Sequence, residues 1–172
     1  MLDIKWWTNL AAVLELCKPY IRVGWLKTVI GGWTTSFRMH EPHKLPCFFG
    51  CCDENDCMLH YLCCPVLWQI VCSHVDGEDS ILTGERVCFQ NPTVRKLQRL
   101  ALCHAVYHQC ENDRESVCFG TVASPMIVQR RAAEFARELR YHCADLSSSQ
   151  VCSSTGYLLA GMYRIGVDAS DA

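Results

Sequence analysis

The chain has 172 residues, 50% of them hydrophobic and 20% charged, with a formal net charge of -2 at pH 7. This composition excludes an intrinsically disordered chain, and the length suits one core of ordinary size or a small metal-binding module beside a helical domain. A net charge so close to zero excludes a general attraction to nucleic acid, so binding of that kind would need a local basic patch.

Cysteine is the most unusual part of the composition, with 14 residues. In a secreted chain this number would indicate a disulfide scaffold. Residues 1–17 lack the basic start and the long apolar run of a signal peptide, and no apolar run approaches the roughly 18 residues that cross a bilayer. We therefore predict an intracellular protein of the nucleus or cytoplasm, neither secreted nor membrane-bound, in which clustered cysteines bind metal.

Residues 1–32 are predicted to form an N-terminal pair of helices. Residues 6–17 and 20–30 are apolar and helical in pattern, and Pro19 separates them because proline suits a helix start but not a helix interior. The tryptophans of this part of the chain are expected in the core, and an exposed platform for stacking bases is the alternative. These tryptophans are Trp6, Trp7, Trp25 and Trp33.

Residues 33–74 are predicted to form a zinc-knuckle segment. Structural zinc takes four cysteine or histidine ligands at tetrahedral corners. Cys47 and Cys51 enclose a Phe-Phe-Gly sequence, and the glycine lets the backbone turn tightly enough for both sulfurs to converge. His60 and Cys64 are one helical turn apart on a predicted helix. We predict that these four residues form one Cys3His site for a structural Zn²⁺.

The choice of ligands leaves alternatives open. Cys52 and Cys63 are adjacent to predicted ligands, and Cys57 lies between the two pairs, so each is a possible replacement. Buried free thiols, which behave as small apolar side chains, and disulfides are alternatives to any metal site. Pro65 lacks the N–H that a continuous helix needs, so the helix predicted over residues 58–72 should kink or restart there.

Three short motifs lie within residues 32–68, namely GWTTSFRMHE, LPCFFGC and HYLCCPVLW. They resemble the cysteine and histidine segment that follows the polymerase domain in non-LTR (LINE-type) retrotransposon reverse transcriptases. The resemblance implies a zinc-binding tail that associates with nucleic acid. The matching residues are Trp33, Thr35, Ser36, Arg38, Cys47, Gly50, Cys51, His60, Tyr61, Cys64, Pro65 and Trp68.

The chain departs from that family in lacking a polymerase core and its paired catalytic aspartates. Some retroelements carry a restriction-like nuclease after the knuckle, in which acids and a lysine bind metal and activate water. The residue types are available here, but their spacing does not form that pattern, and acids in loops are usually solvated. A metal-dependent nuclease is for this reason only the second alternative function. Its candidate residues are Asp76, Glu78, Asp79, Glu85 and Lys96.

Residues 93–172 are predicted to form a C-terminal helical region. In the helix expected at 94–110, His104 and His108 stand one turn apart. We interpret them as surface histidines beside buried cysteines, with a second metal site as the alternative. A further helix is expected to begin at Pro125 and to carry an apolar stripe opposite an arginine-rich face.

Basic residues beside the knuckle and on the last helix are the candidate contacts to nucleic-acid phosphates. For the last helix, the alternative is a solvated face on which glutamates pair with the arginines. We interpret His40 and His43 as ordinary loop histidines. The alternative is that they are additional metal ligands or contacts to phosphates. The candidate contacts are Arg38, Lys44, Arg130, Arg131, Arg137 and Arg140.

The patterns together predict a mainly α-helical protein, with one or more small helical domains around a single Cys3His zinc knuckle. We expect a zinc-binding tail or remnant of a retroelement reverse transcriptase that binds RNA or DNA and has no catalytic activity by itself. No small-molecule substrate is indicated. A zinc-stabilised protein-interaction module, or a degenerate fragment without a nucleic-acid role, is the main alternative.

Overall fold

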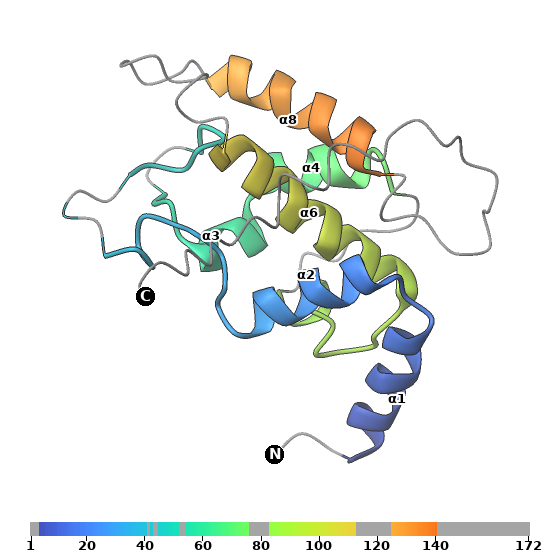
Figure 1. Ribbon diagram of the computed structural model, residues 1–172. Coiled ribbons are helices and arrows are strands. Elements are labelled where there is room, and N and C mark those ends of the chain that lie inside the picture. Colours follow the sequence, from blue (N-terminus) through green and yellow to red (C-terminus); the bar gives the residue numbers. More distant parts are fainter. Residues whose placement is uncertain are drawn as a thin grey trace, which may run out of the picture.

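The computed structural model of the protein describes residues 4–40, 42, 45–51, 54–75, 83–112 and 125–140. These residues are mainly helical (Figure 1), as the sequence predicts. Pairing of the β type within the described ranges is confined to one isolated antiparallel bridge, between Pro46 and Asn55. The helices are α1 (Ile4–Glu15), α2 (Pro19–Val29), α3 (Met58–Cys63), α4 (Pro65–Cys72), α5 (Thr83–Arg86), α6 (Val94–Asn112) and α8 (Pro125–Leu139).

Three helices begin at a proline, as predicted. Pro19 begins α2, Pro65 begins α4 and Pro125 begins α8. Proline suits a first turn because the N–H that it lacks would have no helical partner there. Between α3 and α4, Cys64 has φ -56° and ψ 111°, so the backbone leaves the helical conformation for one residue. The predicted interruption at Pro65 is confirmed, and it creates two short helices.

Helix α6 is the central element of the fold (Figure 1). It packs against α2 and α8, and it also contacts α4 and α5. All residues from 97 to 107 are buried, so this part of the helix is enclosed around its whole circumference. Helix α2 lies close to α6 at Gly24, where a Cβ atom would lie 3.2 Å from both the Cα and the Cβ of Ala101.

One hydrophobic core joins residues from all three regions that the sequence predicts. Trp33 stacks on Tyr61 with ring centroids 6.2 Å apart, and Tyr107 of α6 lies 4.5 Å from Tyr61. Trp25 and Trp33 are buried as expected. Because Tyr61 belongs to α3, this aromatic cluster places the knuckle segment directly on the central helix.

Helix α1 lies at the edge of the molecule and extends away from the other helices (Figure 1), and its one buried residue is Leu10. Trp7 is 52% exposed, so the expectation that it lies in the core is wrong. A helix that projects from the body can bury only the side chains at its junction, which is why the predicted apolar face is incompletely covered. No described helix combines the length and the apolar character needed to span a membrane.

Two histidines of α6 lie beside the aromatic core. His104 is 6% exposed and packs edge-on against Trp33, and its ring centroid is 4.3 Å from that of His108. Burial lowers the pKa of His104 to about 2 and the pKa of His108 to about 4, and the charge of Lys27 acts in the same direction. The surface position predicted for His104 is therefore wrong. Within the described ranges, no third cysteine, histidine or carboxylate joins the pair to form a metal site.

We expect the two histidines to destabilise the protein in acid. Their folded pKa values lie below the ordinary value of 6.5, so the unfolded chain binds protons that the folded chain does not. The stabilising contribution of the two histidines is complete above pH 6.5. Below that pH the free energy of unfolding falls by about 1.4 kcal/mol per pH unit for each histidine. Urea unfolding between pH 7 and pH 5 should show a steeper loss for the wild type than for a His104→Phe, His108→Phe double variant. An equal loss of stability in the two proteins would contradict the lowered pKa values of His104 and His108.

Candidate metal centre

The first half of the centre is a tight turn that carries Cys47 and Cys51. The Cys47 N–H donates to the Glu54 carbonyl at 2.7 Å, and the Gly50 N–H donates to the Cys47 carbonyl at 3.1 Å. Gly50 has φ +85°, a left-handed conformation that strongly favours glycine. A Cβ atom at Gly50 would also overlap the ring of Pro125, the first residue of α8. The turn that the sequence predicted from its glycine is therefore required both by backbone conformation and by packing.

The second half of the centre lies on α3 and at the junction with α4. His60 is in the middle of α3, whose first turn is capped by the Cys57 sulfur, which accepts from the His60 N–H at 3.4 Å. Cys64 occupies the junction between the two helices, and its sulfur accepts from the Leu67 N–H at 3.5 Å. The break before Pro65 thus places Cys64 at the N-terminus of α4, where backbone N–H groups point towards its sulfur.

The fold brings the four predicted ligands together. One ligand atom from each of Cys47, Cys51, His60 and Cys64 lies within 4.8 Å of the other three. The sulfurs of Cys51 and Cys64 are 3.5 Å apart. Cys51 is half-buried and the other three residues are buried. Three sulfurs and one imidazole gathered in this way are the donor set of a tetrahedral metal site.

The neighbouring cysteines have other positions. The Cys57 sulfur caps α3, as described above, and Cys63 is exposed with its sulfur 3.0 Å from the Thr83 hydroxyl. Cys52 lies outside the described residues. The ten cysteines in the described part of the chain form no disulfide. Cys63 ends α3 and Cys64 occupies the junction with α4, and the Cys64 sulfur is the one that lies against Cys51.

The imidazole of His60 has the surroundings of a metal ligand. Its Nε2 is buried and has no hydrogen-bond partner, and its Nδ1 lies 3.6 Å from a carboxylate oxygen of Glu54. A buried polar atom without a partner is costly, whereas a metal ion would satisfy it. Metal-binding histidines commonly direct their second nitrogen towards a carboxylate, which orients the ring. Glu54, which the sequence did not single out, therefore fits the role of a residue that orients His60.

The three thiols affect each other's ionisation. The Cys64 thiol donates to the Cys47 sulfur, and this bond lowers the pKa of Cys47 to about 5 despite its burial. The same bond, together with burial, raises the pKa of Cys64, and burial raises the pKa of Cys51. Cys47 is therefore the most acidic of the three thiols. A divalent cation must displace the protons of Cys51 and Cys64, so metal affinity should increase with pH.

A buried carboxylate, that of Asp56, connects the centre to the rest of the fold. Its oxygens accept hydrogen bonds from the Ser36 N–H at 2.8 Å, the Tyr61 hydroxyl at 2.7 Å and the Tyr107 hydroxyl at 3.3 Å. Burial and the adjacent charge of Asp56 raise the pKa of Tyr61, which therefore stays protonated and donates. Sequence reasoning missed this residue because an aspartate in an acidic, turn-rich stretch has no distinguishing local pattern.

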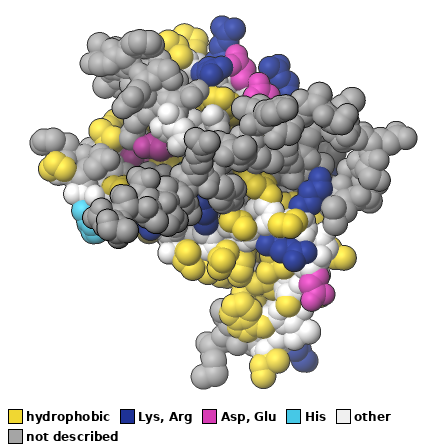
Figure 2. All heavy atoms as spheres, viewed as in Figure 1, with side chains coloured by type: hydrophobic (Ala, Val, Ile, Leu, Met, Phe, Trp, Pro, Cys, Tyr) yellow, Lys and Arg dark blue, Asp and Glu magenta, His cyan; other side chains and the backbone are white. Residues whose placement is uncertain are grey.

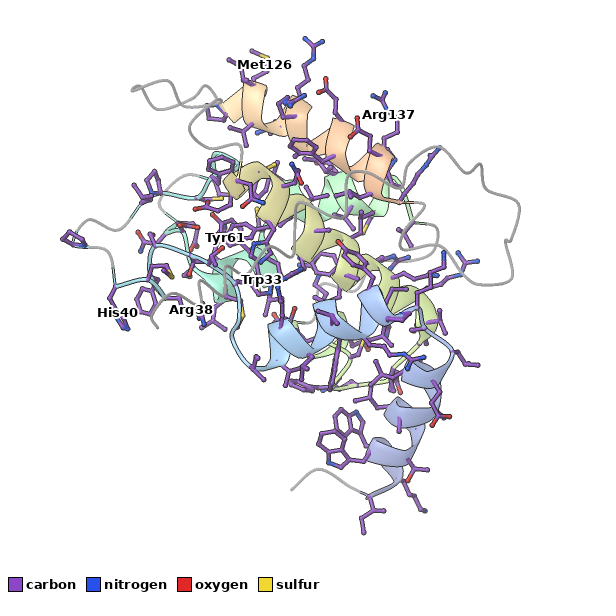
Figure 3. All side chains as sticks on the ribbon, viewed as in Figure 1. Trp33, Arg38, His40, Tyr61, Met126 and Arg137 are labelled. Carbon is purple, nitrogen blue, oxygen red and sulfur yellow. The ribbon has the colours of Figure 1, made fainter. Side chains whose placement is uncertain are left out.

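The predicted basic residues do not form one patch. Figure 3 shows Arg38 and Arg137 on opposite sides of the molecule, and Lys44 lies outside the described residues. On α8, Glu134 accepts from Arg131 at 2.9 Å and lies 3.4 Å from Arg130. Arg137 is exposed and Arg140 is half-buried. The alternative to phosphate binding, a face on which glutamates pair with arginines, is thus present for Arg130 and Arg131, two of the three arginines of α8.

The candidate nuclease residues lie partly outside the described residues, since Asp76, Glu78 and Asp79 fall in an undescribed range. Lys96 and Glu85 form an ion pair with a separation of 3.5 Å. The charges of the described pair thus neutralise each other, and no observation on the described residues favours a nuclease.

No family model, curated protein or solved structure matches the chain. The chemistry of the centre therefore follows from its own geometry. All four ligand positions belong to the protein, and a tetrahedral ion in this site would have no open position for substrate or water. Such an ion would stabilise the fold and would not act as a Lewis acid.

Glu54 should tune metal affinity without contacting the ion. We expect Glu54→Gln to weaken binding of Zn²⁺ or Co²⁺ by about tenfold, because the Nδ1 of His60 loses the carboxylate that orients it. We place the loss of metal affinity at the lower end of the range that is usual for residues orienting a ligand, because the Glu54 side chain is 58% exposed. Competition with a chelating dye measures the change, and Glu138→Gln on the exposed face of α8 is the matched control. Equal affinities for the two variants would refute this role.

Proposed function

We propose that Cys47, Cys51, His60 and Cys64 bind one structural Zn²⁺. The main support for this proposal is that one ligand atom from each of the four side chains lies in the same place. The Nε2 of His60, moreover, is buried there without a hydrogen-bond partner. Thiolate-rich tetrahedral sites favour zinc over magnesium, calcium and manganese, which prefer oxygen ligands. We further propose a reducing intracellular compartment, because the described cysteines form no disulfide and zinc binds cysteine in the reduced state.

Zinc analysis of the purified, reduced protein should give one ion per chain. Chelation should lower the Tm strongly, because structural zinc in small modules contributes about 10 kcal/mol or more to folding. Cys64→Ser should abolish zinc retention, whereas Cys63→Ser, which changes the exposed neighbouring thiol, should leave it intact. A metal-free protein whose Tm does not respond to chelation or to added zinc would overturn the proposal.

For the chain as a whole, we propose a nucleic-acid-binding tail or remnant of a retroelement reverse transcriptase, without catalytic activity of its own. The resemblance of residues 32–68 to the knuckle segment of those enzymes supports this proposal. So does the exposed position of Arg38 on a turn that is bound to Asp56 beside the metal centre. RNA and DNA both offer the phosphate groups that such an arginine would contact.

Binding to single-stranded RNA and DNA across a salt series tests this function. Affinity should fall as salt is raised, because each arginine–phosphate contact releases a counterion. Arg38→Gln should reduce the slope of log affinity against log salt by about 0.7 for a single strand. Arg131→Gln, in which the lost guanidinium already pairs with Glu134, should change it less. Absence of binding at low salt, or affinity independent of salt, would contradict the proposal.

A second candidate, a protein-interaction module, is favoured by the apolar surface of the two N-terminal helices. Figure 2 shows hydrophobic side chains gathered over the part of the molecule where Figure 1 places α1 and α2. Ile4, Trp7, Leu26 and Ile30 are each more than half exposed there. Large contiguous apolar patches commonly mark contacts with another protein. Substitution of Trp7 and Leu26 by serine would separate the two functions, since it should leave nucleic-acid binding unchanged.

A further inference from the structure

The turn at residues 36–40, with the sequence Ser-Phe-Arg-Met-His, has a backbone held firmly from its inner side. The Ser36 N–H donates to the Asp56 carboxylate at 2.8 Å, and the Phe37 N–H donates to the Asp56 carbonyl at 3.4 Å. Thr35 contributes two more bonds, accepting from the Met39 N–H at its carbonyl and from the Arg38 N–H at its hydroxyl. Thr35 and Ser36 are buried, so the turn is anchored in the protein and not a free loop.

The outer side of this turn presents apolar and cationic groups alternately. Phe37 is 60% exposed and Met39 is 57% exposed, and between them Arg38 is also exposed. Figure 3 shows Arg38 and His40 at the same edge of the molecule. His40 adopts φ 54°, a left-handed conformation in which histidine, asparagine and aspartate are the commonest residues after glycine. The turn therefore exposes the large side chains of Phe37, Arg38 and Met39 to solvent, where they contribute little to the core.

Phe37 is also the most exposed aromatic residue in the described ranges. Among the aromatic residues around the knuckle, Trp33, Phe49, Tyr61 and Trp68 are buried in the core, and Phe48 is half-buried against it. If a base stacks on an aromatic side chain near the metal centre, Phe37 is the residue placed to receive it. Proteins that bind single strands combine such a stacking surface with a neighbouring cation for the backbone.

We propose that the turn at residues 36–40 is a binding site for unpaired nucleotides, in which a base stacks on Phe37 while Arg38 contacts the adjacent phosphate. Met39 extends the apolar surface beside the base. The selected ligand is single-stranded RNA or DNA, because bases in a duplex are stacked on each other and do not expose a face to Phe37. This inference rests on the proposed nucleic-acid function and names the form of nucleic acid that it prefers.

The metal centre should control this site through a short connection. Asp56, which anchors the turn, also donates its backbone N–H to the Leu45 carbonyl at 2.8 Å, next to the strand-like segment that carries Cys47. The following residue, Cys57, caps the helix that carries His60. Loss of zinc would release these segments from each other, and the turn would lose its fixed shape. Binding of single strands should therefore require the metal.

The test compares Phe37→Ala and Phe37→Trp with the wild type on a labelled 12-nucleotide single strand and on a blunt 12-base-pair duplex. Trp7→Ala is the matched control, since it removes another exposed aromatic side chain, one that belongs to α1, the helix that projects from the body of the molecule (Figure 1). Phe37→Ala should weaken single-strand binding about tenfold, and Phe37→Trp should retain it, because stacking accounts for a factor of this order per base. Affinity for the duplex should stay the same in all four proteins. Unchanged zinc content and Tm verify that the variants fold.

The outcomes separate the stacking site from the wider function. Salt-dependent binding of the wild type that Phe37→Ala does not weaken, or weakens equally for duplex and single strand, overturns the stacking site and leaves phosphate binding in place. Absence of binding by the zinc-loaded wild type at low salt overturns both, and leaves a protein partner as the occupant of the exposed turn. Chelation should abolish the preference for single strands, and a preference that survives zinc removal would overturn the connection through Asp56.

Discussion

The Asp56 carboxylate is the interaction on which the arrangement around the metal centre depends. A buried carboxylate is tolerated only when hydrogen bonds replace its lost hydration, and three donors supply them here. The donors come from three separate places: the turn at residues 36–40, α3 through Tyr61 and α6 through Tyr107. Removing the carboxylate would leave buried donors unsatisfied on all three. The central helix and the knuckle therefore hold one relative position.

The short segment at residues 54–57 combines most of the support for the centre. Glu54 contributes its carbonyl to the cysteine turn and its carboxylate to the orientation of His60. Asp56 binds the turn at residues 36–40, and Cys57 caps α3. A segment of this kind couples metal binding to the shape of the neighbouring surface. Zinc would stabilise the knuckle as a unit, and with it the display of Phe37 and Arg38.

The basic residues have a different distribution from the one that the chain suggests. A run of arginines on one helix resembles a phosphate-binding face, but Glu134 lies between Arg130 and Arg131 and neutralises part of their charge. Arg38 stands alone in the sequence and yet occupies the exposed turn beside the metal centre. Surface ion pairs contribute little to stability, so the main effect of Glu134 is on the local potential. We therefore place the proposed nucleic-acid contact at the knuckle.

The sequence by itself determined the helical class, the helix starts at Pro19, Pro65 and Pro125, and the four residues that converge at the centre. These features are local, because proline restricts its own backbone and the ligand spacing reflects a tight turn and one turn of helix. Only the tertiary structure decided that Asp56 is buried and that Trp7 is exposed. Burial depends on which surfaces meet, and a residue distant in the chain, such as Tyr107, makes an aspartate in an acidic stretch the anchor of the site.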